Sequence, residues 1–129
     1  MVDTVNMDRR TVPRPDPDVA LDPEPDSGPV VVRTVYTIAA DREPDFMRAM
    51  LRVREMRLRT GATQWGLFRN GERPGEFEEI FVVASWDEHV RQHRERMTAT
   101  DFAYEEQAKV LSEAAPETWH LLPTDLGEK

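Results

Sequence analysis

Two of the three histidines in this chain are spaced so that both could face one ligand. His89 and His93 lie four residues apart, which places two imidazoles on the same face of a helix and within reach of one metal ion. In zinc proteases a glutamate follows the first histidine, but here Val90 does, and His120 lies far along the chain. We therefore predict no metal site. His89 and His93 are expected at the surface or at an interface, as supporting residues.

A second candidate is Glu79, which lies within a β-branched and aromatic run at residues 76–86. If this run is a strand, its alternation puts Glu79 on one face with three apolar side chains. These are Phe77, Phe81 and Val83. A carboxylate in such surroundings suits the role of general base, and we predict Glu79 as the catalytic residue. An inter-strand salt bridge to Arg33 or Arg69 is an equally good interpretation.

Six large side chains could together line a cavity for a hydrophobic small molecule. They are Tyr36, Trp65, Phe68, Phe81, Trp86 and Met97. We predict them as substrate-binding residues, with Arg33, Arg69, His89 and His93 as supporting polar groups. The alternative is that the aromatic side chains, Trp86 among them, are simply core residues.

Composition excludes several classes of protein. The 129 residues carry 17 basic and 25 acidic side chains, a net charge of -8, which argues against nucleic acid or an anionic membrane as the main partner. The chain has no cysteine, which excludes disulfides, thiolate catalysis and cysteine-based metal centres. No apolar run approaches the roughly 18 residues of a membrane span. We expect a cytoplasmic protein that does not insert into membranes.

The elements that must position these residues follow from apolar periodicity. The predicted order is strand 30–38, helix from Asp41 to Thr60, strand 62–69, strand 76–86, short helix 87–97, helix from Thr98, and strand 118–122. Thr98 and Asp101 have the spacing of a capping box at the start of the second long helix. The order β-α-β-β-α-β predicts an α+β, ferredoxin-like fold.

Both faces of the 76–86 run are mainly apolar, which is unusual for a sheet with helices on one face and water on the other. One face must pack on helices, and the other is expected to meet a second sheet. We therefore predict a homodimer of the dimeric α/β-barrel type, joined through the face that carries Phe77, Phe81 and Val83.

The first 29 residues differ in composition from the rest of the chain. They hold six of the ten prolines and no apolar period, so we predict an extended, disordered arm rich in proline and aspartate. An alternative is that the arm docks on the domain through Val19 and Leu21. The folded domain is expected to span residues 30–123, followed by a tail at 124–129.

Two stretches carry a resemblance to a known family. They are GPVVVRTVYTIAADREPDFMRAM and RLRTGATQWGLFRNGERPGEFEEIFVVASWDEHVRQHRERMTATD. The chain resembles, over about residues 13–112, the cytosolic C-terminal tail of enterobactin-exporter-like transporters of the major facilitator superfamily. That tail is in turn similar to the antibiotic biosynthesis monooxygenase superfamily, whose fold is the dimeric α/β barrel. Because this sequence starts at Met1 without membrane helices, we expect a free-standing relative or an excised piece.

The resemblance implies two functions that the residues leave open. The first is a cofactor-independent monooxygenase-like or cyclase-like enzyme that acts on a hydrophobic polyketide-type intermediate in natural-product biosynthesis. Such enzymes bind and deprotonate a substrate that itself reduces oxygen, so no metal or organic cofactor is expected. The second is a non-catalytic ligand-binding or dimerisation module, like the transporter tail. The heme-degrading relatives use an Asn–Trp–His set, of which only Trp86 has a counterpart here.

Overall fold

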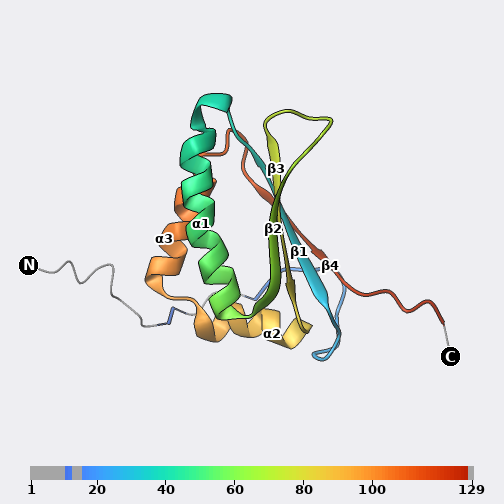
Figure 1. The fold of residues 1–129 in the computed structure, drawn as a ribbon. Coiled ribbons are helices and arrows are strands. Elements are labelled where there is room, and N and C mark those ends of the chain that lie inside the picture. The colour runs from blue at the N-terminus through green and yellow to red at the C-terminus, as the bar shows by residue number, and fades with distance from the viewer. Residues whose placement is uncertain (1–10, 13–15, 128–129) are drawn as a thin grey trace, which may run out of the picture.

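The computed structural model describes residues 11–12 and 16–127, and its elements follow the predicted order (Figure 1). The strands and α-helices are β1 (Val30–Thr37), α1 (Glu43–Thr60), β2 (Ala62–Arg69), β3 (Glu76–Val83), α2 (Trp86–Arg91), α3 (Ala99–Lys109) and β4 (Glu117–Leu121). The strands form one antiparallel sheet in the order β2-β3-β1-β4. This is the ferredoxin-like arrangement, so the predicted α+β fold class is confirmed.

Helix α1 covers one face of the sheet because its apolar residues recur at helical spacing. Its start differs from the prediction, since a 3-10 turn at Ala40–Arg42 precedes it and no side chain caps it. Its end is set by Gly61, whose φ of 137° favours glycine. A Cβ on Gly61 would also lie 2.9 Å from a guanidinium nitrogen of Arg96. The glycine therefore lets Arg96 approach the end of α1 and donate to the Thr60 carbonyl at 3.0 Å.

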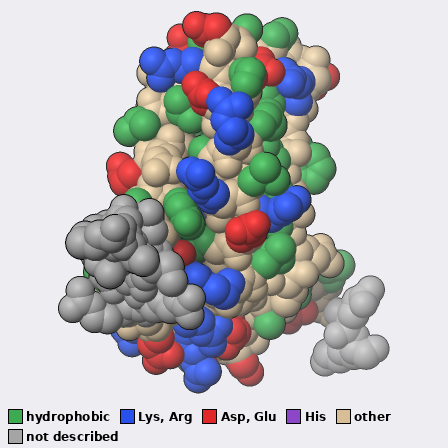
Figure 2. Space-filling model, turned by 60° about the vertical axis from the view of Figure 1, so that its left-hand side comes forward, with side chains coloured by type: hydrophobic (Ala, Val, Ile, Leu, Met, Phe, Trp, Pro, Cys, Tyr) green, Lys and Arg blue, Asp and Glu red, His purple; other side chains and the backbone are tan. Residues whose placement is uncertain are grey.

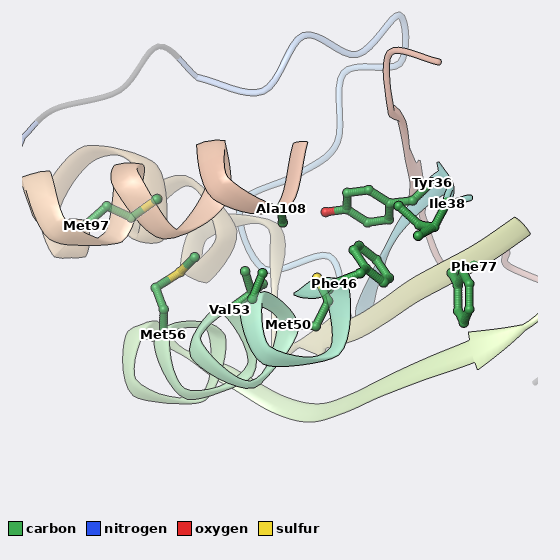
Figure 3. Close-up of a cluster of buried hydrophobic side chains, with 10 residues drawn as sticks. Tyr36, Ile38, Phe46, Met50, Val53, Met56, Phe77, Met97 and Ala108 are labelled. Carbon is green, nitrogen blue, oxygen red and sulfur yellow. The ribbon is translucent and has the colours of Figure 1, made fainter. Parts of the chain in front are cut away.

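The main core lies between the sheet, α1 and α3 (Figure 3). Its buried members are Tyr36, Ile38, Phe46, Ala49, Met50, Val53, Met56, Phe77, Met97 and Ala108. The Phe46 ring of α1 contacts two strands of the sheet, with its centroid 5.1 Å from that of Tyr36 on β1 and 5.4 Å from that of Phe77 on β3. The Tyr36 hydroxyl points toward Ala108 of α3 (Figure 3).

The two faces of the sheet differ in what covers them. Along β3 the alternation buries Phe77, Glu79, Phe81 and Val83 beneath the helices, as Figure 1 shows for the elements. The prediction that this face joins two protomers is therefore wrong, because α1 and α2 already cover it within one chain. The opposite face carries no helix among the described residues, and it exposes Phe68, Trp119 and Leu121.

The shorter elements depart from the predicted bounds by a few residues. Strand β3 ends at Val83 and not at Trp86, because the Ser85 hydroxyl accepts the Glu88 N–H at 3.1 Å and starts α2 there. A π-helical turn, Gln92–Arg96, follows α2. The capping box is confirmed, with Thr98 and Asp101 exchanging hydrogen bonds of 3.2 and 2.8 Å. Among the helices in the described part of the chain, none combines the length and apolarity of a membrane span.

Residues 16–29 form no helix or strand but contact the domain at both ends. The carbonyls of Pro25 and Ser27 accept the backbone N–H groups of Asp87 and Trp86, at 2.9 and 2.7 Å. Asp16 forms two hydrogen bonds with the Arg94 guanidinium, at 2.8 and 2.6 Å. Leu21 is 68% exposed. The predicted disorder and docking of the arm stay predictions, and residues 1–10 and 13–15 lie outside the described residues.

Candidate functional site

A pocket of about 320 Å³ opens between the helix-covered face of the sheet and the helices. Strands β1, β3 and β4 supply its floor, while α1, the α2 region, α3 and residues 16–17 supply its walls. The lining residues are Asp16, Pro17, Val32, Thr34, Tyr36, Arg57, Phe81, His89, His93, Glu105, Lys109, Thr118 and His120. The pocket therefore combines apolar walls with imidazoles and hydroxyl groups, the mixture typical of small-molecule sites.

A second hollow of about 630 Å³ lies over the outer side of α1 and α3. Three arginines line it, but each has a partner: Arg52 contacts Gln107, Arg59 contacts Asp101, and Arg96 contacts Glu88. Figure 2 shows that basic and acidic side chains alternate over the helix-bearing face of the molecule. Because these three arginines are already paired, they offer no free cation to an anionic ligand, and we take the histidine pocket as the candidate site.

Glu79 lies just behind the wall of this pocket and is fully buried. Its carboxylate accepts hydrogen bonds from Arg57, with Nε to Oε2 at 3.0 Å and Nη2 to Oε1 at 3.4 Å. The indole Nε1 of Trp65 donates to Oε2 at 2.8 Å, and the Tyr36 hydroxyl donates to Oε1 at 3.5 Å. Both oxygens accept hydrogen bonds and the carboxylate faces the Arg57 guanidinium, which favours the salt-bridge interpretation. The catalytic role of Glu79 stays a prediction.

The partner of Glu79 comes from a helix, so the expectation that Arg33 or Arg69 would pair with it is wrong. Arg33 lies on the opposite face of the sheet, where it pairs with Glu78 at 2.6 Å. Arg69 lies at the end of β2 and reaches Glu43 at 2.9 Å. Alternation along a strand decides the first case, since residues 33 and 79 project from opposite faces.

Arg57 joins two carboxylates in this buried cluster. Besides Glu79, it donates to Glu105 at 2.6 Å, and its guanidinium lies 4.9 Å above the centroid of the Phe81 ring. Burial alone would lower the pKa of Arg57, but the two carboxylates hold it well above its usual range. Burial, and then the Glu79 charge, raises the pKa of the Tyr36 hydroxyl, which therefore stays protonated.

All three histidines lie at this pocket. His89 is buried, with its ring centroid 5.1 Å from that of His120 and 4.7 Å from that of His93. The prediction of a surface or interface position is wrong for His89, because α2 turns its ring inward between Phe81 and Trp86. Burial lowers the pKa of His89 to about 3 and also lowers that of His120. Within residues 11–12 and 16–127, no group of three side chains has metal-binding geometry.

The predicted substrate-binding residues separate into three groups. Tyr36 and Phe81 line the pocket, and Trp86 lies beside it, 6.0 Å from the His120 ring centroid. Trp65 contacts Glu79 behind the pocket, and Met97 belongs to the main core. Phe68 is 55% exposed on the uncovered face, because its register opposite Glu78 turns it away from the helices. Of the six residues predicted to line a cavity, Trp65, Phe68, Trp86 and Met97 therefore do not line this pocket.

Sequence reasoning missed Arg57, Glu105 and His120 as pocket residues. A signal existed for Arg57, which follows the buried Val53 by four residues and so lies near the apolar stripe of α1. Glu105 likewise follows the capping residue Asp101 by four residues, on the inward side of α3. His120 gave no signal, since its meeting with His89 depends on how β4 aligns with α2.

The sequence pattern of the family described as "Transmembrane secretion effector" matches residues 2–124. No curated protein matches the sequence.

Several solved structures share this fold. A protein from Caulobacter crescentus CB15, provisionally described as an antibiotic biosynthesis monooxygenase, superposes with a TM-score of 0.65 at 16% identity, covering 78% of this chain and 93% of its own. A variant of SnoaB, a cofactor-independent oxygenase from Streptomyces nogalater, gives 0.62 at 17% identity, covering 77% and 97%. Rv0793 from Mycobacterium tuberculosis gives 0.58 at 19% identity, covering 78% and 100%. The chain is thus similar to monooxygenase-like proteins in fold.

Proposed function

This chain belongs to the transmembrane secretion effector family, and we propose that its α+β domain binds a small, mainly apolar molecule in the histidine pocket. The observation that carries the proposal is the pocket itself. It sets apolar walls at Val32 and Phe81 against the hydroxyls of Thr34 and Thr118, which lie 2.9 Å apart, and against His120. Such a site discriminates by shape and by a few polar contacts.

The charges around the pocket indicate an uncharged ligand. Arg57 is paired with both Glu79 and Glu105, and Asp16 is paired with Arg94. A charged ligand would have to break one of these pairs and would lose its own hydration. An aromatic or enolic ring with one hydroxyl would keep the pairs intact and use the imidazole and hydroxyl groups for its polar end.

The second candidate function is a cofactor-independent oxygenase or cyclase that acts on a polyketide-type phenol or enol. It is supported by the similarity in fold to SnoaB and by neutral histidines in the pocket, which can accept a proton. The same ligand class serves both functions, and turnover separates them. We favour the binding module because Glu79, the predicted base, is held in an ion pair.

Binding of a model phenol tests the proposal. We expect 4-nitrophenol to bind with one-to-one stoichiometry in calorimetry, and Thr118→Trp to weaken it by about tenfold or more because the indole fills the pocket at its exposed edge. Thr63→Trp places the same side chain on exposed β2, away from the pocket, and should bind as the parent does. Equal affinity for both variants, or no binding by the parent, would contradict the proposal.

We further propose that the domain forms a homodimer through the uncovered face of the sheet. The face is apolar at Phe68, Trp119 and Leu121, which are 55%, 49% and 49% exposed, and at half-buried Val31, Val35, Ile80 and Val82. An apolar surface of this kind on a soluble domain marks an interaction site. The Arg33–Glu78 ion pair lies within it and would be shielded from water in the dimer.

Light scattering tests the dimer. The parent is expected to have twice the protomer mass at micromolar concentration, and Ile80→Glu is expected to shift it to the protomer mass by placing a charge within the interface. Leu58→Glu makes the same change at an exposed position of α1 and should remain dimeric. A parent of protomer mass, or a dimeric Ile80→Glu protein, would remove this interface.

A further inference from the structure

A chain of hydrogen bonds leads from the pocket into the end of α1, and its direction can be derived. The Thr60 hydroxyl donates to the Met56 carbonyl at 2.8 Å, so its oxygen accepts from the Gln92 amide nitrogen at 3.1 Å. The amide oxygen of Gln92 is thereby turned toward His89 Nδ1, at 2.9 Å. An amide oxygen only accepts, so His89 must carry its proton on Nδ1.

The tautomer of His89 determines the tautomer of the neighbouring His120 ring. Because His89 is protonated on Nδ1, its Nε2 has a lone pair, and this atom lies 3.2 Å from Nε2 of His120. His120 must therefore donate from Nε2, and its own Nδ1 has a lone pair. In the described part of the chain, His89 is the hydrogen-bond partner of the His120 ring, and Nδ1 is not engaged.

We propose that His120 is the proton acceptor of the pocket and that His89 is the positioning residue that fixes its tautomer. The inference rests on the proposed function for its ligand, a phenol or enol. The proton leaves the ligand oxygen for Nδ1 of His120, which gives a ligand oxyanion and an imidazolium. The imidazolium keeps its Nε2–H bond to His89, now charge-assisted, and no oxidant or cofactor enters this step.

The chain of hydrogen bonds from Thr60 through Gln92 and His89 to His120, here called the relay, keeps the same donors and acceptors at neutral pH. His89, with a pKa of about 3, stays neutral and keeps accepting from His120 across the neutral range. Burial lowers the pKa of His120, so its acceptor is free at neutral pH. The other titratable groups that line the pocket are Asp16, Tyr36, Arg57, His93, Glu105 and Lys109. The orienting group is a neutral ring and not a carboxylate, which makes His120 a modest base suited to acidic hydroxyls.

Nitrogen NMR of the histidine rings tests the tautomers directly. We expect the Nδ1–H form for His89 and the Nε2–H form for His120. Gln92→Leu removes the acceptor that fixes the relay, so the His120 ring should shift toward the Nδ1–H form, whereas Gln92→Glu keeps an acceptor and should preserve the direction. Gln107→Leu, on the exposed side of α3, is the matched control. The opposite tautomers in the parent would overturn the inference.

Proton transfer is read with 4-nitrophenol, whose phenolate is coloured, beside nitrobenzene, which lacks the hydroxyl. The parent should raise the phenolate fraction of bound probe at fixed pH, by about tenfold in the phenolate-to-phenol ratio. At saturating probe, His120→Gln should lose this enrichment in the 4-nitrophenol that it binds, because the acceptor for the phenol proton is gone. If the parent binds 4-nitrophenol without enriching the phenolate, the proton-acceptor role of His120 is overturned and the proposed binding function is not. Failure of both compounds to bind overturns the proposed function. The histidine tautomers measured by NMR then still test the hydrogen-bond chain from Gln92 to His120.

Discussion

Replacing Arg57 with methionine is expected to lower the free energy of unfolding by about 3–5 kcal/mol. Arg57 is the guanidinium that faces both Glu79 and Glu105, so its removal leaves two carboxylates in a water-poor interior. Methionine keeps most of the apolar stem of the side chain, so lost packing contributes little. Urea unfolding at neutral pH measures the change, with Arg54→Met on the exposed side of α1 as the control, expected within about 0.5 kcal/mol of the parent.

A double variant separates the ion pair from the packing. When Glu79→Gln is added to Arg57→Met, one of the two unpaired charges is removed, and the loss should be smaller than for Arg57→Met alone. The glutamine keeps an acceptor for the Trp65 indole. If the double variant loses as much free energy of unfolding as the two single variants together, the two side chains do not interact energetically. That result would contradict a structural role for the pair.

Mild acid is expected to destabilise the domain by about 2 kcal/mol between about pH 7.5 and pH 5. The cause is His89, whose pKa of about 3 in the folded protein lies far below its ordinary value of 6.5. Below pH 6.5 the unfolded chain binds a proton at His89 that the folded chain does not bind, so stability falls as pH falls. The effect is fully absent above this window and continues to grow toward pH 3.

The range from pH 7.5 to pH 5 avoids the titration of the paired carboxylates. Arg33 and Arg96 lower the pKa values of Glu78 and Glu88, so their contributions are lost only as pH falls below about 4.5. His89→Gln should weaken the dependence on pH measured by urea unfolding and leave the contribution of His120, whose pKa burial also lowers. His93→Gln, the same change four residues along the chain, should keep the His89 contribution. A parent whose stability is constant from pH 7.5 to 5 would contradict the buried, neutral imidazole.

Local sequence signals predicted the elements well because each is decided within a few residues. The capping box of Thr98 and Asp101 and the apolar stripe of α1 are examples, and both occur as predicted. The face of β3 that the helices cover was not predictable in this way, because both of its faces are apolar. Alternation says which residues share a face, and it does not say what lies against that face.

The site was only partly predictable because its contacts join distant segments. Glu79 was correctly placed among apolar residues, yet its partner is 22 positions away on a helix, where strand register gives no information. The histidines show the same limit. The i, i+4 spacing pointed to His93, whereas His89 forms hydrogen bonds with Gln92 and with His120, which lies 31 positions along the chain.

The segment before β1 connects the pocket to the turn after α2. Pro17 and Asp16 form part of its wall, and Asp16 is at the same time tied to Arg94 in the turn after α2. An occupant that contacts residues 16–17 is coupled to the position of that segment, and by thermodynamic linkage a displacement of the segment then changes the affinity of the pocket by the same factor by which the occupant changes the position of the segment. For such an occupant, binding in the pocket and the position of residues 16–17 form one coupled equilibrium.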